Sequence, residues 1–141
     1  MTREEMTAFF TRRLEAMNRH AAAELALQHT EDGTVDSPFS GGVSQGREEI
    51  ERTYAGVIRA FPDVKLSQET LLIDGDRATS LMIMSGTGHS GIMGLPPAAR
   101  AFSVPIVFLD EFRGGLIHRE RRIYDFTGLL IQIGVLKAKP I

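Results

Sequence analysis

Charged side chains are concentrated on one expected strand, residues 116–125, which follows a pair of glycines that predicts a tight turn. Alternation places Arg119, Arg121 and Asp125 on one face of this strand, together with two isoleucines. Because buried charges must be paired or solvated, two guanidinium groups and a carboxylate among apolar side chains predict a polar pocket lined by a curved sheet.

The opposite face of the same strand is equally mixed, so the residue pattern alone does not decide which face points into the pocket. It carries Leu116, His118, Glu120, Arg122 and Tyr124. We expect the Asp125 face to point into the pocket, but a single β-bulge would exchange the two faces because side chains alternate with a period of two.

Several other chemistries lack the residues that they need. The chain has no cysteine, which excludes disulfides, thiolate catalysis and cysteine metal sites. It contains no phosphate-binding loop, no nucleophile elbow and no zinc-protease motif, and His20 and His29 have no partner at metal-ligand spacing. We therefore expect no metal and no cofactor.

Composition indicates one soluble domain over residues 1–141. The hydrophobic fraction is 43% and the charged fraction 24%, which is normal for a chain with a single core. A net charge of -2 and a pI near 6.1 provide no general attraction for nucleic acid. The first residues are charged and no stretch is long and apolar enough to span a membrane, so we expect a cytoplasmic protein that binds neither nucleic acid nor membrane.

The hydrophobic pattern changes from helical to extended along the chain. Apolar residues recur every three to four positions in three predicted helices, residues 2–18, 21–28 and 47–61. Alternation then predicts strands, which are 34–38, 64–73, 77–88, 101–112 and 116–125. Helices followed by antiparallel strands predict an α+β domain, with the helices against the concave face of a curved sheet. Such a sheet leaves a cavity at its open end.

Three segments carry a resemblance to a known family. They are D-F-T-G-L-L-I-Q-I-G-V-L at 125–136, G-T-G-H-S-G-I-M-G-L-P-P at 86–97 and G-R-E-E-I at 46–50. The chain resembles the SnoaL-like polyketide and ester cyclases over nearly its whole length. This implies the fold of nuclear transport factor 2, a cone-shaped antiparallel or mixed sheet wrapped around three helices. The substrate is not implied, because this fold serves many functions.

The chain departs from that family at two places. Ala98-Ala99 stands where relatives often have Thr-Gly after the two prolines, and Asp36-Ser37-Pro38 stands where many have His-Asp-Pro. The first change removes a hydroxyl group and a flexible turn, and the second alters the polar lining of the expected pocket.

The resemblance assigns catalytic roles to two residues. Asp125 falls on the aspartate that acts as acid and base in ring closure by aldol condensation, and His89 falls on a loop histidine that could exchange a proton or polarise a carbonyl. Each has a simpler reading. Asp125 before Thr127-Gly128 could cap a turn or a short helix, and His89 among glycines and serines could be a solvated turn residue.

Six further residues are expected to bind a small apolar, carbonyl-bearing substrate: Arg121, Arg119, Tyr54, Phe39, Met84 and Met93. The arginines could hold a carboxylate or an enolate, and the methionines could adapt to its shape. The alternatives are a surface ladder of the arginines with Glu111 and Glu120, and plain core packing of the apolar side chains.

The function that we predict is a cofactor-independent cyclase or isomerase. One alternative is a non-catalytic domain of the same fold that binds a small molecule or pairs protomers. Another is an epoxide hydrolase, which needs an arginine between two carboxylates around a water, for which Asp36, Arg121 and Asp125 are candidates. We also expect a homodimer through the outer sheet face, because strands 64–73 and 101–112 carry apolar residues of both parities: Leu71, Ile73, Val104 and Ile106.

Overall fold

The computed structural model describes residues 1–138. Three helices come early in the chain, α1 (Arg3–Asn18), α2 (Ala22–Leu27) and α3 (Arg47–Ala60), close to their predicted ranges. Thr2 begins α1 with a capping box, as its spacing from the following glutamate indicates. A short fourth helix, α4 (Phe126–Gln132), follows the last strand, where the alternatives for Asp125 were the cap of a turn or of a short helix.

Six strands form one sheet in the order β2-β1-β6-β5-β4-β3. They are β1 (His29–Ser37), β2 (Gly42–Gln45), β3 (Lys65–Asp74), β4 (Arg77–Gly86), β5 (Phe102–Arg113) and β6 (Leu116–Tyr124). β1 runs parallel to β6 and all other neighbours are antiparallel, which confirms the α+β class and a mixed sheet. The strand β2 was not predicted. It lies in a stretch rich in glycine and serine, and a single 3-10 turn, η1 (Pro38–Ser40), separates it from β1.

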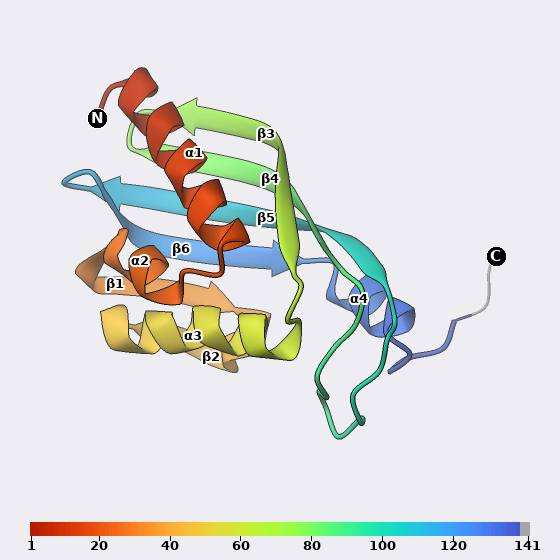
Figure 1. Cartoon of the computed structure of the whole chain (residues 1–141). Helices are drawn as coiled ribbons and strands as arrows, with labels where there is room; N and C mark the ends of the chain where they lie inside the picture. Colours follow the sequence, from red (N-terminus) through yellow and green to blue (C-terminus); the bar gives the residue numbers. More distant parts are fainter. Residues whose placement is uncertain (139–141) are drawn as a thin grey trace.

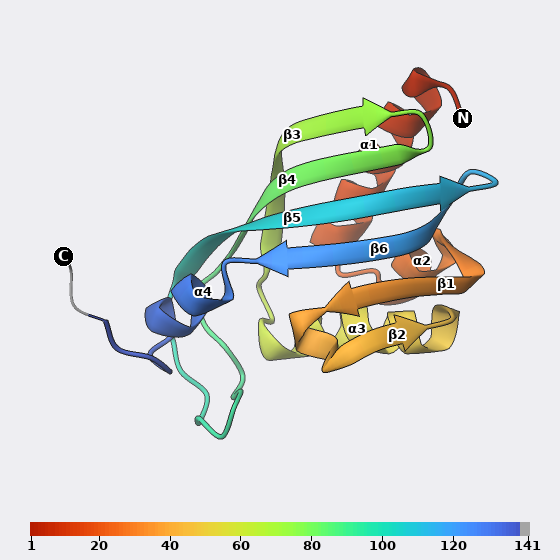
Figure 2. The same ribbon diagram turned by 180° about the vertical axis from the view of Figure 1, so that it is seen from behind.

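The helices α1, α2 and α3 cover one face of the sheet (Figure 1). Seen from behind, the other face carries no helix (Figure 2), and we call it the outer face. The helix α4 (Phe126–Gln132) lies at one end of the sheet, where β6 ends. Apolar side chains between the helices and the sheet form the core, so any buried polar group there must find its partners inside the protein.

A bulge in β6 decides which side chains of that strand point inward. Glu111 of β5 pairs with Arg119, but Phe112 pairs with Ile117, which leaves His118 as the extra residue. Ile117 is therefore buried, and the burial then alternates in the opposite sense along the rest of β6. The expected facing of this strand is wrong for this reason.

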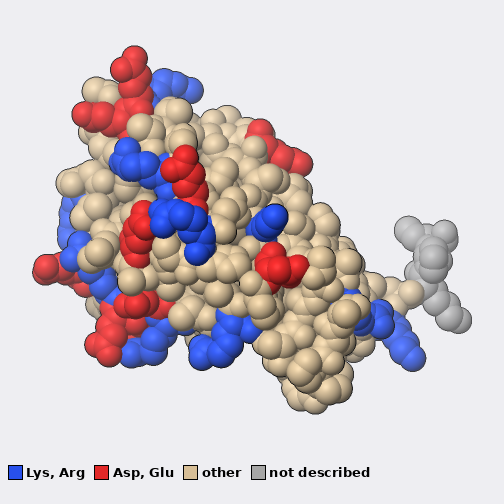
Figure 3. Space-filling model, in the orientation of Figure 1, with Lys and Arg blue, Asp and Glu red and all other residues tan. Residues whose placement is uncertain are grey.

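The segment between β4 and β5, residues 87–101, projects from the end of the sheet (Figure 1). Its arms approach closely, because His89 and Ala98 form an isolated antiparallel bridge. In the space-filling view the charged side chains gather over the helices, whereas the lower end formed by this segment is almost free of them (Figure 3). Within residues 1–138, no helix has the length and apolar character needed to cross a membrane.

The four apolar residues on which the expected dimer rested do not form an outer patch. Val104 and Ile106 are buried in the core, and Leu71 and Ile73 are half-buried against a second apolar cluster beneath the first half of α1. The reasoning from strand parity is wrong here because both pairs face the helices. The dimer itself stays a prediction.

Candidate functional site

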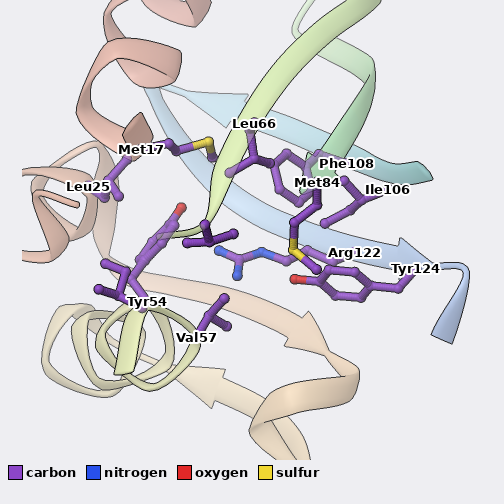
Figure 4. A pocket seen from close by; sticks show the side chains of 12 residues that line it. Met17, Leu25, Tyr54, Val57, Leu66, Met84, Ile106, Phe108, Arg122 and Tyr124 are labelled. Carbon is purple, nitrogen blue, oxygen red and sulfur yellow. The ribbon is translucent and has the colours of Figure 1, made fainter. Parts of the chain in front are cut away.

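An apolar cavity of about 40 Å³ lies between the helices and the inner face of the sheet (Figure 4). Its lining comes from all three covering helices, from the turn after α3 and from four strands: Met17, Leu25, Tyr54, Val57, Ile58, Val64, Leu66, Met84, Ile106, Phe108, Arg122 and Tyr124. Only Tyr54, Arg122 and Tyr124 bring polar groups to this lining. The space holds little more than a water molecule or two, so a larger ligand requires its flexible side chains to move.

Arg122 extends from β6 towards Tyr54, and its guanidinium lies between two aromatic rings (Figure 4). Its Cζ is 4.5 Å from the ring centre of Tyr54 and 5.2 Å from that of Phe108. Nε donates to Oε2 of Glu120 at 2.7 Å, and Nη2 is buried without a hydrogen-bond partner among the described residues. Since the side chain is only 3% exposed, this arginine is a buried cation at the edge of an apolar cavity.

Arg13 of α1 supplies a second buried guanidinium. Nη1 donates to Oδ2 of Asp110 at 2.9 Å, while Nη2 donates to Glu120 and, at 3.2 Å, to the hydroxyl of Tyr54. We refer to Arg13, Asp110, Glu120 and Arg122 as the ion network. Its members come from α1, β5 and β6, so it ties the first helix to the middle of the sheet.

The two carboxyl groups of the ion network have opposite pKa shifts. Burial alone would raise the pKa of Glu120, but Arg13 and Arg122 lower it below the usual range. Burial and the neighbouring Glu120 raise the pKa of Asp110 well above its usual value, against the attraction of Arg13. The opposite shifts share one cause, because two adjacent buried carboxyl groups do not both ionise readily and Glu120 has the two guanidinium contacts that favour its charge.

His29, at the start of β1, completes the polar surroundings of Tyr54. Its Nε2 lies at hydrogen-bond distance, 3.0 Å, from the Tyr54 hydroxyl, which accepts from Arg13. Burial, with help from nearby guanidinium groups, lowers the pKa of His29 to about 3. Burial also raises the pKa of Tyr54. At neutral pH the pair is therefore an uncharged imidazole and an uncharged phenol.

The structure brings only two of the predicted substrate-binding residues to this cavity, Tyr54 and Met84. Phe39 lies just outside it, edge-on to the ring of Tyr124 at 5.1 Å between centroids. Met93 is 58% exposed in the loop after β4 and does not contribute.

Arg119 and Arg121 lie on the outer face, away from the cavity, because of the bulge at His118. The side chain of Arg119 is 69% exposed and its Nε lies 3.8 Å from Glu111. Both arginines were expected to point into the pocket, and that placement is wrong. Arg119 fits the alternative interpretation, in which the strand arginines form a ladder with glutamates on the protein surface.

Asp125 caps α4. Its side chain is exposed, and Oδ1 accepts a hydrogen bond from the N–H of Gly128 at 3.0 Å. A Cβ atom at position 128 would meet this carboxylate, so any other residue there would require the Asp125 side chain to move out of the cap. Asp125 is not part of the cavity lining, although it directly follows Tyr124, which is.

His89 lies in the segment after β4 and is buried there. Its Nδ1 accepts from the N–H of Gly91 at 3.2 Å, so the neutral ring carries its proton on Nε2, which is buried without a partner. It faces a separate shallow hollow lined by Asp63, Thr87 and other loop residues. The structure does not place His89 and Asp125 around one cavity.

The residues considered for epoxide hydrolysis are not assembled either. Asp36 and Arg121 are cross-strand neighbours on the outer face, and Asp125 caps α4. An arginine does lie between two carboxyl groups, but it is Arg13, which is fully buried and does not line the cavity.

Sequence reasoning missed the ion network, although two signals for it exist. Arg13 shares the helical face of Phe10 and Met17, and Asp110 shares the parity of the buried residues Phe108 and Phe112. A charge that interrupts an apolar stripe marks a buried polar group. Within residues 1–138, no group of three or more His, Asp or Glu side chains is arranged as a metal site.

Comparison with known families is consistent with this geometry. The model of the family described as SnoaL-like polyketide cyclase matches residues 8–133. The chain belongs to this family of SnoaL-like polyketide cyclases. No functionally curated protein matches it in sequence.

Solved structures share the fold at low sequence identity. AclR, a candidate hydroxylase from Streptomyces galilaeus, has a TM-score of 0.85 and 21% identity over 99% of this chain and 87% of its own. IdmH, a candidate polyketide cyclase from Streptomyces antibioticus, has a TM-score of 0.78 and 24% identity over 91% and 97%. A protein with a ketosteroid isomerase-like fold from Catenulispora acidiphila, in complex with trimethylamine, has a TM-score of 0.75 and 25% identity over 99% and 100%. The nuclear transport factor 2-like fold is thereby confirmed.

Proposed function

We propose that this protein is a cofactor-independent cyclase or isomerase that acts by acid/base catalysis on a small, apolar, carbonyl-bearing molecule in the cavity. The observation that carries the proposal is Arg122, a buried guanidinium with an unpartnered nitrogen at the edge of an apolar cavity. Removing a proton next to a carbonyl creates negative charge on the carbonyl oxygen. A fixed cation in surroundings of low dielectric constant stabilises that charge more than the neutral ground state.

Asp125 is the proposed base, on the strength of the family motif and its position. It directly follows Tyr124, so it lies next to the end of the cavity that this ring lines. The carboxylate acts on the part of a substrate that extends past Tyr124, and a change of its side-chain rotamer releases it from the cap on Gly128. His89 is the proposed assisting acid on the strength of the family motif alone, because it faces the separate hollow. Its Nε2 proton is unpartnered among the described residues, and a movement of the loop after β4 would be needed to bring it to the cavity.

One observation favours a second candidate function, a non-catalytic domain that binds a small molecule. Asp125 has a structural task as the cap of α4, and a cap needs no basicity. The polar lining contributed by Tyr54 and Arg122 would bind a ligand equally well without chemistry. The two functions differ in whether Asp125 is needed for turnover.

The test is exchange of the protons next to the carbonyl of 2-tetralone for deuterium, followed by proton NMR in D2O. Asp125→Asn keeps a hydrogen-bond acceptor for the cap but has no useful basicity. We expect it to lower the exchange rate about a hundred- to ten-thousand-fold. It should change the free energy of unfolding by about 1 kcal/mol or less.

Asp36→Asn is the matched control, because Asp36 is an exposed aspartate on the outer face. It should leave both exchange and stability unchanged. If Asp125→Asn exchanges deuterium as fast as the wild type, Asp125 is only a cap and the binding domain is the better account.

A further inference from the structure

The unpartnered end of Arg122 is unusual for a protein interior. Nη2 is buried with no acceptor among the described residues, and the side chain is 3% exposed. A buried donor that has lost its water and gained no partner costs free energy, so such groups are rare unless they serve a purpose. Because Arg122 lines the cavity, a ligand there can supply the missing acceptor.

The geometry around Arg122 restricts which acceptor fits. The rings of Tyr54 and Phe108 hold the guanidinium between them and fix its plane. Glu120 occupies Nε, so the edge formed by the two Nη atoms is left for a ligand. A planar group with two equivalent oxygens matches this edge, because two parallel N–H···O bonds can form.

The charge of the ion network favours an anion over a neutral carbonyl. Two guanidinium groups face the carboxylate of Glu120, which both of them contact, and Asp110, whose pKa is raised by burial and by Glu120. The raised pKa disfavours the negative charge of Asp110, so Glu120 is the main counter-charge for two buried guanidinium groups. An unbalanced buried charge is costly, and a monoanionic ligand would balance it.

We propose that the cavity binds its ligand as a monoanion, with a planar delocalised oxyanion on the free Nη edge of Arg122. The ligand chemistry is shared by an aryl carboxylate and by the enolate of a 1,3-dicarbonyl compound. This inference rests on the proposed function in that it concerns the same cavity, but it makes a claim about binding and not about turnover.

The test compares two probes of the same shape by isothermal titration calorimetry, the anion 2-naphthoate and the neutral 2-naphthamide. The wild type should bind 2-naphthoate at least about tenfold more tightly, a difference of ~1.4 kcal/mol. A second arm uses benzoylacetone, whose absorption spectrum distinguishes the enolate from the neutral form. A bound enolate spectrum at a pH where the free compound is neutral identifies the dicarbonyl anion as a ligand, and its absence restricts the oxyanion to carboxylates.

Variants test whether Arg122 causes the preference for 2-naphthoate over 2-naphthamide. Arg122→Gln should abolish it, and Arg121→Gln, on the outer face, should keep it. Because removing one buried cation can prevent folding, the double variant Glu120→Gln with Arg122→Gln removes both charges of that pair. It should fold and bind both probes alike.

Equal binding of the two probes by the wild type, binding of neither, or a preference that persists in the folded double variant would overturn the inference. These results are independent of the deuterium exchange test. If Asp125→Asn loses exchange but the wild type shows no preference for the anion, the enzyme proposal stands and the anion site does not. If Asp125→Asn exchanges normally but the wild type prefers the anion, the anion site stands and the enzyme proposal does not.

Discussion

The two faces of β6 carry similar side chains in opposite settings. On the inner face, Glu120 and Arg122 are buried, joined to each other and to partners from α1 and β5. On the outer face, Arg119 and Arg121 are exposed, and Arg119 has only a long contact of 3.8 Å to Glu111. The comparison shows that residue type does not decide whether an arginine on this strand is buried. The partners that allow its burial do.

The partner that completes the burial lies far away in the sequence. Arg13 comes from the first helix, 107 residues before Glu120. Asp110 is near in sequence, because it is the residue opposite Glu120 across the β5–β6 hairpin, but its contact with Arg13 again depends on the packing of α1 over the sheet. Within residues 1–138 no element covers the strands on the outer face, so the arginines there are solvated and their ion pairs contribute little.

Removing the carboxylate of Glu120 should have the largest effect on folding. Glu120→Gln leaves Arg13 and Arg122 buried together without their shared counter-charge. We expect a loss of about 3–5 kcal/mol in the free energy of unfolding, measured by urea denaturation. Glu111→Gln, which weakens only exposed pairs, should cost less than about 1 kcal/mol. Equal costs for the two variants would show that the faces do not differ as described.

The pH dependence of stability should come next. The pKa of His29 falls from 6.5 to about 3 on folding, so the unfolded chain binds its proton first as the pH is lowered. The part of the folding stability that depends on an uncharged His29 is complete above pH 6.5 and is lost as the pH falls towards 3. Over this range the free energy of unfolding changes by up to about 1.4 kcal/mol per pH unit. The lowered pKa of Glu120 also makes the protein less stable as the pH falls, but only at pH values below the ordinary pKa range of a glutamate. The raised pKa of Asp110 has the opposite effect on stability.

Urea denaturation at several pH values between 5 and 6.5 isolates the histidine. In His29→Gln the amide can still hydrogen-bond to Tyr54 but does not titrate, so the change of the free energy of unfolding per pH unit in this interval should be lower than in the wild type by up to about 1.4 kcal/mol, whatever Asp110 contributes to both proteins. His118→Gln, on the bulge of β6, is the control and should leave the slope unchanged. A His29→Gln variant with the wild-type slope would mean that the imidazole is not held uncharged.

Much of the fold was predictable because the signals for it are local. The apolar stripes of α1 and α3 and the alternation of β3, β4 and β5 depend on neighbours in sequence, and the observed ranges follow them closely. The mixed strand β6 was not predictable in its facing. A bulge of one residue at His118 inverts the pattern, and nothing in the local sequence distinguishes the two choices.

The candidate site was predictable only in part for the same reason. Tyr54 and Met84 were found because each lies in an apolar pattern whose facing was clear. Arg122 was assigned to the wrong face together with its strand, and Arg13 was overlooked because a single charge in an amphipathic helix usually lies at its edge. Buried ion networks depend on contacts between distant segments, which periodicity does not report.

A substitution on the outer face should have the smallest effect on folding. We propose that this face pairs two copies of the chain, because Leu109 and Ile123 are 37% and 47% exposed on neighbouring strands that no helix covers. The double variant Leu109→Lys with Ile123→Lys should change the free energy of unfolding by about 0.5 kcal/mol or less. Light scattering at micromolar concentration should give a dimer for the wild type and 15.5 kDa for the variant. A wild type of 15.5 kDa would remove the proposal.

The central claim is that ligands bind at the inner face of β6. NMR of methyl-labelled methionine tests this claim most directly. Of the six methionines, Met17 and Met84 line the cavity beside Arg122, whereas Met93 is exposed in the distant loop. Titration with 2-naphthoate should shift the methyl signals of Met17 and Met84 and leave that of Met93 in place. Shifts confined to Met93, or no shift at either cavity methionine at saturating probe, would contradict the assignment of the site to this cavity.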